Sequence, residues 1–210
     1  MGTLHAVAKA GPRSQPPGED LRGRLIDAAV RVLARDGFAH ASARAIAQEA
    51  GTVNGSIFYY FGSMDGLLAA TARALAERGV ARIGDGLGGD RAHLEWPARL
   101  SAVMRAEAEG EDGQAVMELF VGARTSPALA AEVRAAIDQA IDYAIAEMQR
   151  VLGGSPITHL IPVDLIAELA AAAFLGIEVL AQNGREIDLD RLATTLAAGV
   201  QLVTGSASRP

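Results

Sequence analysis

The sequence predicts an all-helical protein of about nine helices, on three observations. Half of its 210 residues are hydrophobic, and alanine, the best helix former, is abundant. Apolar residues recur at the three-to-four-residue spacing of a helix face, and no segment shows the alternation typical of a strand. Glycine, proline and capping residues separate these stretches. The pattern predicts a three-helix head at the N-terminus, followed by a longer helical body.

The composition excludes several classes of protein. The chain has no cysteine, so it can form neither a disulfide nor a thiolate metal site. No apolar run is long enough to span a membrane, and the N-terminus lacks the apolar core of a signal peptide. We therefore expect a cytoplasmic protein with no membrane partner.

The net charge of −6 conceals an uneven distribution of charge along the chain. Residues 1–85 contain ten Lys/Arg and eight Asp/Glu, which gives +2, and residues 86–210 contain nine and seventeen, which gives −8. A nearly neutral N-terminal part on an acidic remainder suits a DNA-binding head on a body that does not bind DNA. Ordinary variation of surface charge would produce the same counts.

The head is predicted to contain an arm and three helices. Residues 1–18 hold three of the eight prolines and show no periodicity, which indicates a flexible arm. A helix begins at Glu19 and ends at Gly37, as a left-handed cap would end it. Two short helices follow, over Ser42–Ala50 and Val53–Tyr60, and complete a domain of residues 19–62. The apolar stripe of the first helix consists of Leu25, Ile26, Ala29, Val32 and Leu33.

Residues 63–210 are predicted to form the body. Ser63 is the expected cap of a long helix from Met64 to about Ile83, and the glycine-rich residues 84–90 are expected to form a loop. Ser126 before Pro127, and Asp188, are capping residues of later helices. These later helices are predicted at about 92–109, 112–123, 127–152, 163–183 and 189–204.

The two short helices and the glycine turn between them have the pattern of a helix-turn-helix. In this motif the first short helix lies across the DNA backbone and the second enters the major groove. Gly55 and Ser56 are small enough for a close approach to the bases, and the hydroxyls of Tyr59 and Tyr60 can reach phosphates. Thr52 is the expected cap of the second helix. The side chains of this helix expected in the core are Ile57, Phe58 and Phe61.

Short stretches of the head and of the next helix form a specific combination, although each alone would be a weak signal. They are Leu25-Ile26-x-Ala28-Ala29, Asp36-Gly37-Phe38, Arg44-x-Ile46-Ala47-x-x-Ala50-Gly51, Gly55-Ser56-Ile57-Phe58-Tyr59-Tyr60-Phe61-x-Ser63 and Leu67-Leu68. Over about 45 residues this combination resembles the TetR family of bacterial repressors. The rest of the chain is similar to that family only in the number and length of its helices.

The resemblance implies DNA-binding roles for individual residues. Ser42 and Arg44 would meet DNA from the start of the first short helix. Residues 53–56 would line the major groove, and Tyr59 and Tyr60 would hold phosphates. The full expected set is Ser42, Arg44, Thr52, Val53, Asn54, Gly55, Ser56, Tyr59, Tyr60 and Ser63.

Two of these residues have an alternative interpretation. Asn54 either reads adenine through two hydrogen bonds or merely begins a helix, where asparagine is common. Arg44 either reaches DNA or forms an ion pair with Glu49 on its own helix.

The chain also departs from the family pattern. Phe58 stands where a tyrosine is common, and Val53 stands where a serine often caps the recognition helix. Gly62 and Met64 stand where lysines often bind the DNA backbone. The free N–H groups at the start of the fourth helix can still bind an anion.

Several helices of the body contain large or soft apolar side chains, and in the TetR resemblance these helices surround a ligand cavity. Such cavities are mostly apolar with a few polar anchors, and methionine adapts to varied shapes. We therefore expect a small lipophilic or aromatic effector, although the same side chains would suit an ordinary core. The expected ligand-binding residues are Trp96, Leu100, Met104, Met117, Phe120, Val121, Arg124, Tyr143 and Glu178, with Glu118 as a further polar anchor.

The last two predicted helices indicate a homodimer through residues 163–204. Each has an apolar stripe that is too long for one short neighbour to cover. The small residues Ala172, Ala173 and Gly176 allow a second helix to approach closely. We expect these helices to pair with their two-fold mates in a four-helix bundle.

The sequence shows no catalytic constellation, so we expect no enzymatic activity, no cofactor and no metal. Its four histidines stand apart from one another, and the carboxylates of residues 107, 109, 111 and 112 fit a solvated helix end better than a metal site. We expect a ligand-responsive transcriptional regulator that acts as a repressor and binds a near-palindromic operator in double-stranded DNA. The alternatives are a helical interaction protein that has lost DNA binding and, less favoured, a helical enzyme.

Overall fold

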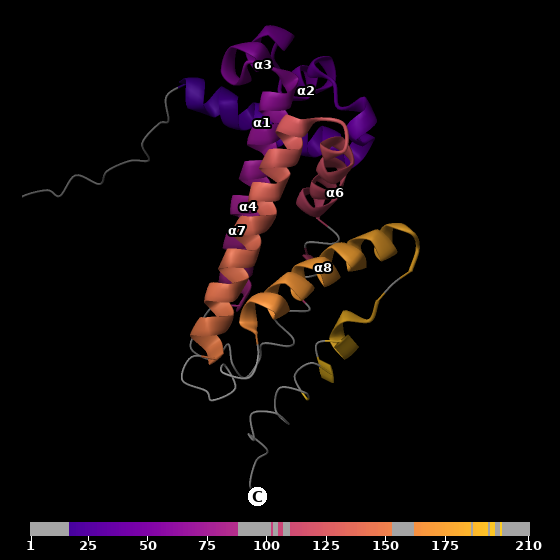
Figure 1. Cartoon of the computed structure of the whole chain (residues 1–210). Coiled ribbons are helices and arrows are strands. Elements are labelled where there is room, and N and C mark those ends of the chain that lie inside the picture. Colours follow the sequence, from indigo (N-terminus) through magenta and orange to yellow (C-terminus); the bar gives the residue numbers. More distant parts are fainter. Residues whose placement is uncertain are drawn as a thin grey trace, which may run out of the picture.

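The structure is a computed structural model, and it describes residues 17–87, 110–152, 162–185 and 187–192, together with residues 102, 105, 106, 194, 195 and 198. Within these residues every regular element is a helix, which confirms the all-helical prediction (Figure 1). The expected flexible arm lies outside the described residues except for Pro17 and Gly18, which are helical.

The head has the three expected helices and one additional turn of 3₁₀-helix. The first helix begins two residues earlier than expected, at a proline, whose fixed φ suits a helix start. It ends at Gly37, where φ is 80° and the N–H donates to the Leu33 carbonyl. The elements are α1 (Pro17–Asp36), η1 (Phe38–His40), α2 (Ala43–Glu49) and α3 (Asn54–Phe61).

Helix α4 (Met64–Leu87) is longer than the sequence predicts. Its start is as expected, because the Ser63 hydroxyl accepts a hydrogen bond from the Gly66 N–H at 3.0 Å. The expected loop from residue 84 is wrong as far as Leu87. A Cβ at Gly84 would lie 2.5 Å from the Tyr143 hydroxyl of α7, so the missing side chain lets α7 approach α4 closely. Packing against α7 therefore accounts for helix in a stretch whose local sequence favours a loop.

The body contains α6 (Glu111–Ala123), α7 (Pro127–Leu152) and α8 (Val163–Gln182). The Ser126 hydroxyl accepts from the Leu129 N–H, which confirms it as the cap of α7. The Asp188 carboxylate accepts from the Arg191 N–H, and residues 189–192 are helical, so the last predicted helix begins as expected. The predicted helix at 92–109 lies almost wholly outside the described residues. Helices α4 and α7 run side by side along the long axis of the molecule (Figure 1).

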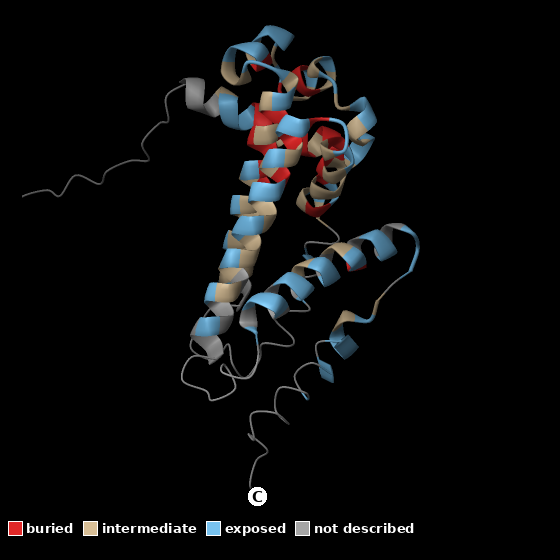
Figure 2. Ribbon diagram, in the orientation of Figure 1, coloured by how far each residue is buried: buried red, intermediate tan, exposed pale blue. Residues whose placement is uncertain are grey.

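Two hydrophobic clusters form the core, and both lie in the upper part of Figure 2. The first closes the head and joins α1, α2, α3 and the start of α4. The second joins α1 and α4 to α6 and α7. Helices α1 and α4 belong to both clusters, so the head is packed directly onto the body. Central residues of the first cluster are Leu25, Ile46, Ile57 and Leu67, and those of the second are Leu33, Leu75, Leu119 and Leu129.

Helix α6 is also attached to the head through η1. The Phe38 ring packs onto Gly122, because a Cβ at this glycine would lie 2.0 Å from Cε2 of the ring. The Phe38 N–H donates to Glu118 Oε2 at 2.6 Å. The carboxylate expected to anchor a ligand is thus bound to the backbone of the head. None of the described helices is long and apolar enough to cross a membrane.

The contact between Phe38 and Gly122 predicts that alanine will change the stability of the protein differently at two glycines. Gly122→Ala should overpack the contact with Phe38 and lower the free energy of unfolding by roughly 1–3 kcal/mol. The matched control is Gly23→Ala in α1, where nothing lies within 4 Å of the added Cβ. This control should be neutral or stabilising by up to about 1 kcal/mol, because alanine favours a helix. Urea unfolding measures both, and equal stability of the two variants would contradict the packing of Phe38 on Gly122.

Candidate nucleic-acid interface

Helices α2 and α3 form the predicted helix-turn-helix, with bounds within one residue of those expected. Ser42 caps α2, because its hydroxyl accepts a hydrogen bond from the Ala45 N–H at 3.2 Å. The chain turns at Gly51, where φ is 67°, a conformation that favours glycine. The Thr52 N–H then donates to the Ala47 carbonyl at 2.9 Å, which closes the turn before α3 begins at Asn54.

The prediction that Thr52 caps α3 is wrong. Val53 occupies the N-cap position, with φ −102° and ψ 153°, and no side chain caps the helix. The Thr52 hydroxyl instead lies 2.9 Å from the Ser56 hydroxyl. An apolar side chain at the N-cap leaves the first N–H groups of α3 without a side-chain acceptor. The start of α3 is therefore an uncapped helix end at the surface of the protein.

One face of α3 is buried and the other is exposed. Ile57 is fully buried in the head core, and Phe61, four residues later, packs against the same core. Phe58 was expected in the core, but 52% of its surface is exposed. A step of one residue turns a side chain by about 100° around the helix, which carries Phe58 out of the buried face. The exposed face of α3 thus presents an aromatic ring to solvent.

The two tyrosines of α3 form an edge-to-face pair. Their ring centroids lie 4.9 Å apart, and the ring planes meet at 89°. Tyr60 is half-buried and packs against the head core, whereas Tyr59 is 82% exposed. The half-buried ring supports the exposed one, since edge-to-face pairs of this separation are favourable.

An open concavity lies between the two short helices. It is lined by Arg44, Gln48, Gly51, Thr52, Val53, Asn54 and Gly55. The expected residues Arg44 and Asn54 therefore meet on one surface. Gln48 was not among the expected site residues, although its position four residues after Arg44 on α2 places it on the same helix face.

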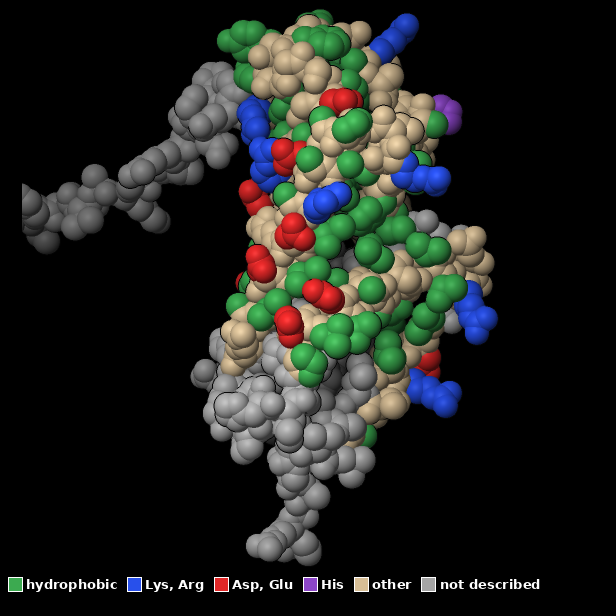
Figure 3. Space-filling view, in the orientation of Figure 1, with side chains coloured by type: hydrophobic (Ala, Val, Ile, Leu, Met, Phe, Trp, Pro, Cys, Tyr) green, Lys and Arg blue, Asp and Glu red, His purple; other side chains and the backbone are tan. Residues whose placement is uncertain are grey.

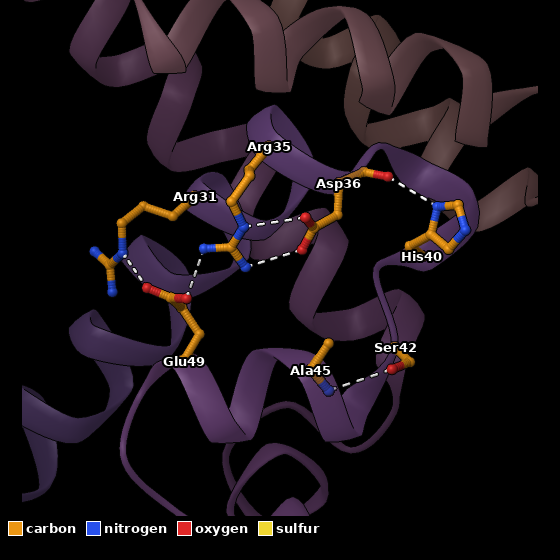
Figure 4. A network of polar contacts seen from close by, with 7 residues as sticks. All are labelled: Arg31, Arg35, Asp36, His40, Ser42, Ala45 and Glu49. Atoms are coloured by element: carbon orange, nitrogen blue, oxygen red, sulfur yellow. Dashed lines mark hydrogen bonds and ion pairs between the residues drawn. The ribbon is translucent and has the colours of Figure 1, made fainter.

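The alternative partner of Arg44 is occupied by other side chains. Glu49 accepts hydrogen bonds from Arg31 Nε at 2.8 Å and from Arg35 Nη1 at 3.0 Å, both from α1 (Figure 4). Within the described part of the chain Arg44 forms no ion pair, and its side chain is exposed. These observations remove the pairing of Arg44 with Glu49 and leave its guanidinium available to a ligand.

The same network fixes α2 against α1. Arg35 also binds Asp36 through two parallel contacts of 3.0 and 2.9 Å, and His40 Nδ1 lies 2.9 Å from the Asp36 carbonyl oxygen. Hydrogen bonds from Arg31 and then Arg35 lower the pKa of Glu49 below its ordinary value of 4.5. The hydrogen bond from Arg35 lowers the pKa of Asp36 in the same way. The carboxylates of Glu49 and Asp36 thus hold the side chains of Arg31 and Arg35 at one end of α2.

Comparisons with known proteins agree with this geometry. Residues 25–71 match the family model described as bacterial regulatory proteins, tetR family. These residues, which include α2 and α3, therefore form a DNA-binding region of the TetR type. No curated protein matches the sequence.

Solved structures of transcriptional regulators share the fold of most of this chain. A TetR-family transcriptional regulator from Rhodococcus sp. is 20% identical with a TM-score of 0.72, over 89% of this chain and 99% of that one. A TetR transcriptional regulator from Chloroflexus aurantiacus J-10-FL is 23% identical with a TM-score of 0.70, over 88% and 96%. A transcriptional regulator from Saccharomonospora viridis, crystallised in complex with choline, is 20% identical with a TM-score of 0.67, over 87% and 96%.

The expected ligand-binding residues of the body are only partly described. Met117, Val121 and Arg124 share one face of α6, and Val121 and Arg124 are exposed. Phe120 packs against the second core cluster, and Tyr143 lies against Gly84 of α4. The side chains outside the described residues are Trp96, Leu100, Met104 and Glu178.

One of the acidic residues at the start of α6, Asp112, contacts arginines of α4. Asp112 Oδ2 lies 2.6 Å from Arg82 Nη1, and Asp112 Oδ1 lies 3.8 Å from Arg78 Nη1. Asp112 therefore belongs to an ion-pair network between the two helices. Among the described residues no group of three His, Asp or Glu side chains could hold a metal ion. Residues 107 and 109 of the same cluster lie outside the described part of the chain.

The Glu49 network predicts a pH-dependent contribution to stability. Because the pKa of Glu49 is lowered in the folded chain, its contribution is complete above the ordinary value of 4.5 and is lost as the pH falls through the lower folded-state pKa. Glu49→Gln should reduce the free energy of unfolding at pH 7 by about 1 kcal/mol, as expected for two partly exposed ion pairs. Urea unfolding at several pH values measures the difference, which should shrink at acidic pH. The control Glu77→Gln removes an exposed carboxylate of α4 and should show no such trend.

Proposed function

We propose that this chain is a ligand-responsive transcriptional repressor of the TetR family that binds a near-palindromic operator as a homodimer. A small lipophilic or aromatic effector releases it from DNA. The observation that carries the proposal is the surface at the start of α3. There an uncapped helix start, Asn54 and Arg44 of α2, which has no ion pair with the described residues, line one open concavity. A helix of this kind fits the major groove, which admits one α-helix with its N-terminal residues at the base edges.

In this proposal several residues of the exposed surface have a defined partner on DNA. Asn54 forms two hydrogen bonds with an adenine, and the 71%-exposed Val53 packs against the methyl group of a thymine. Gly55 allows a close approach, since a Cβ there would meet nothing within 4 Å. Residues on both sides of Val53 and Asn54 bind phosphates of the DNA backbone. The phosphate-binding residues are Ser42, Arg44, Tyr59, Tyr60 and Ser63, with Thr52 and Ser56 supporting the turn.

The second copy of the chain is proposed to cover α8. Large hydrophobic side chains on this helix are exposed in the single chain, and most of its surface is exposed in Figure 2. Within the described residues the main neighbour of α8 is α7. Exposed apolar stretches of this length are typical of interfaces, and a stable dimer would bury about 1,600 Å². The residues concerned are Leu165, Leu169, Val179, Leu180 and, after the turn, Leu192.

The effector is proposed to bind in the body. The apolar side chains of Met117 and Val121 share a face of α6 with the exposed Arg124, which offers a cationic anchor at the edge of an apolar surface. The related regulator crystallised with choline supports small-molecule binding by this fold. Because α6 holds the head through Glu118 and Phe38, a ligand on α6 is placed to shift the head. Family regulators are generally non-enzymatic, and we propose no reaction for this chain.

One observation favours a second candidate, a helical interaction protein that no longer binds DNA. Residues 45–72, which include α3 and the start of α4, contain no lysine or arginine. Most DNA-binding proteins derive much of their affinity from cations that neutralise phosphates. Measurement of DNA binding separates the two candidates.

Selection of binding sites from random duplex DNA tests the proposed function. The parent chain should select a near-palindrome whose half-sites lie about 34–36 Å apart, or a multiple of this distance. Asn54→Ala should weaken binding to this site by about 1–3 kcal/mol and relax the preference at one base pair of each half-site. The control Gln114→Ala removes an exposed amide from α6 and should bind like the parent. Failure of the parent to select any site would favour the interaction protein, and loss of binding on addition of lipophilic compounds would identify the effector class.

A substitution that introduces a charge on α8 tests the proposed dimer. Leu169 is 60% exposed in the single chain, so Leu169→Asp should fold but place an unpaired charge in the proposed interface. Light scattering at micromolar concentration should report a dimer for the parent and a monomer for this variant. Ala135→Asp, which adds the same charge to an exposed position of α7, should remain dimeric. A monomeric parent would refute the proposed dimer.

A further inference from the structure

The DNA-facing part of the head has few cations of its own. Between Arg44 and Arg73 the sequence contains no lysine or arginine, so neither α3 nor the start of α4 supplies one. Four arginines near the head are already bound to carboxylates. Arg31 and Arg35 bind Glu49, Arg73 binds Glu132 and Arg78 binds Asp27.

Arg22 occupies the region where these cations are missing. It belongs to α1, yet its guanidinium carbon lies 5.3 Å from the ring centroid of Phe61, the last residue of α3. Its side chain is exposed, and it forms no ion pair with any described residue. Figure 3 shows arginine side chains at the surface over the first part of α1, beside the uncharged surface of α3. A cation from a distant part of the sequence therefore lies against the last residue of α3, which directly precedes the turn into α4.

The contact with Phe61 holds the guanidinium without consuming its hydrogen-bonding capacity. A cation above an aromatic ring is attracted to the face of the ring. The five N–H donors of arginine lie in the plane of the guanidinium, and they match the oxygens of a phosphate. Arg22 is thus positioned by an apolar platform while its donors remain available to an anion.

Arg22 and Arg44 lie at opposite ends of α3. Arg44 lines the concavity at the start of the helix with Val53 and Asn54, whereas Arg22 lies at its last residue. An eight-residue helix is about 12 Å long, and the major groove is about 12 Å wide, with a phosphate strand on each side. We propose that Arg22 binds a backbone phosphate at the α3–α4 end of the recognition helix, opposite the strand that Arg44 contacts. This assignment rests on the proposed function, because it concerns the same DNA complex.

The dependence of operator binding on salt tests the assignment. Each phosphate neutralised by a protein contributes about 0.9 to the slope of log affinity against log salt, so two copies of Arg22 in a dimer contribute about 1.8. Arg22→Met removes the charge but keeps an unbranched chain that can cover Phe61. Its slope should be shallower than that of the parent by about 1.8, and its affinity for operator and unrelated DNA should fall by the same factor. Between 50 and 200 mM salt the ratio of parent to variant affinity should therefore shrink about 12-fold.

Two further variants separate a phosphate contact from other effects. Arg22→Lys retains the charge and should retain most of the slope. Arg134→Gln removes one exposed arginine from α7 and should leave the slope unchanged, which controls for net charge. An unchanged slope for Arg22→Met, or a loss confined to one operator sequence, would overturn the assignment. A parent that binds no DNA would instead refute the proposed function, and the two failures are thus distinguishable.

Discussion

The burial of two adjacent faces of α1 is the constraint on which the rest of the structure depends. One face, which includes Leu25 and Val32, closes the core of the head, and the next, with Val30 and Leu33, enters the core shared with α4, α6 and α7. Full burial of a side chain of this size stabilises by about 1.5–3 kcal/mol. The head cannot separate from the body without exposing the second face. The head and the body of this chain are therefore parts of one packed unit.

Polar contacts complete this unit where apolar packing ends. The pair of Arg31 and Arg35 on Glu49 sets the position of α2 on α1, and the hydrogen bond from Phe38 to Glu118 ties the turn after α1 to α6. Each contact lies at the end of a short element, where backbone or side-chain groups would otherwise have no partner. A displacement of α6 would act on the turn that leads directly into α2.

Local signals in the sequence were sufficient for most of the fold of the described residues. Ser42, Ser63, Ser126 and Asp188 cap helices as predicted, because a cap is an interaction between a side chain and backbone groups two or three residues away. Residues 84–87 could not be predicted from their glycines, since their helix depends on α7, which lies far along the chain.

The candidate site shows the same division between local and distant information. The helix-turn-helix was predictable from spacing, but two details of α3 were not. The N-cap is Val53, one residue after the predicted Thr52, and Phe58, the residue after the buried Ile57, is exposed. The partners of Glu49 come from 14 and 18 residues earlier on another helix, so sequence spacing left Arg44 as a plausible partner. The position of Arg22 beside Phe61 also results from tertiary packing, and no local sequence motif predicts it.

The absence of cations from residues 45–72 has a consequence for how such a regulator would search a chromosome. Non-specific binding depends almost entirely on phosphate neutralisation, and a genome offers about 10⁶–10⁹ competing sites. A head with few cations spends little time on each wrong site and slides over short distances before it dissociates. Under the proposed function fewer copies would be sequestered on unrelated DNA, and a small number of molecules per cell would be enough to keep one operator occupied.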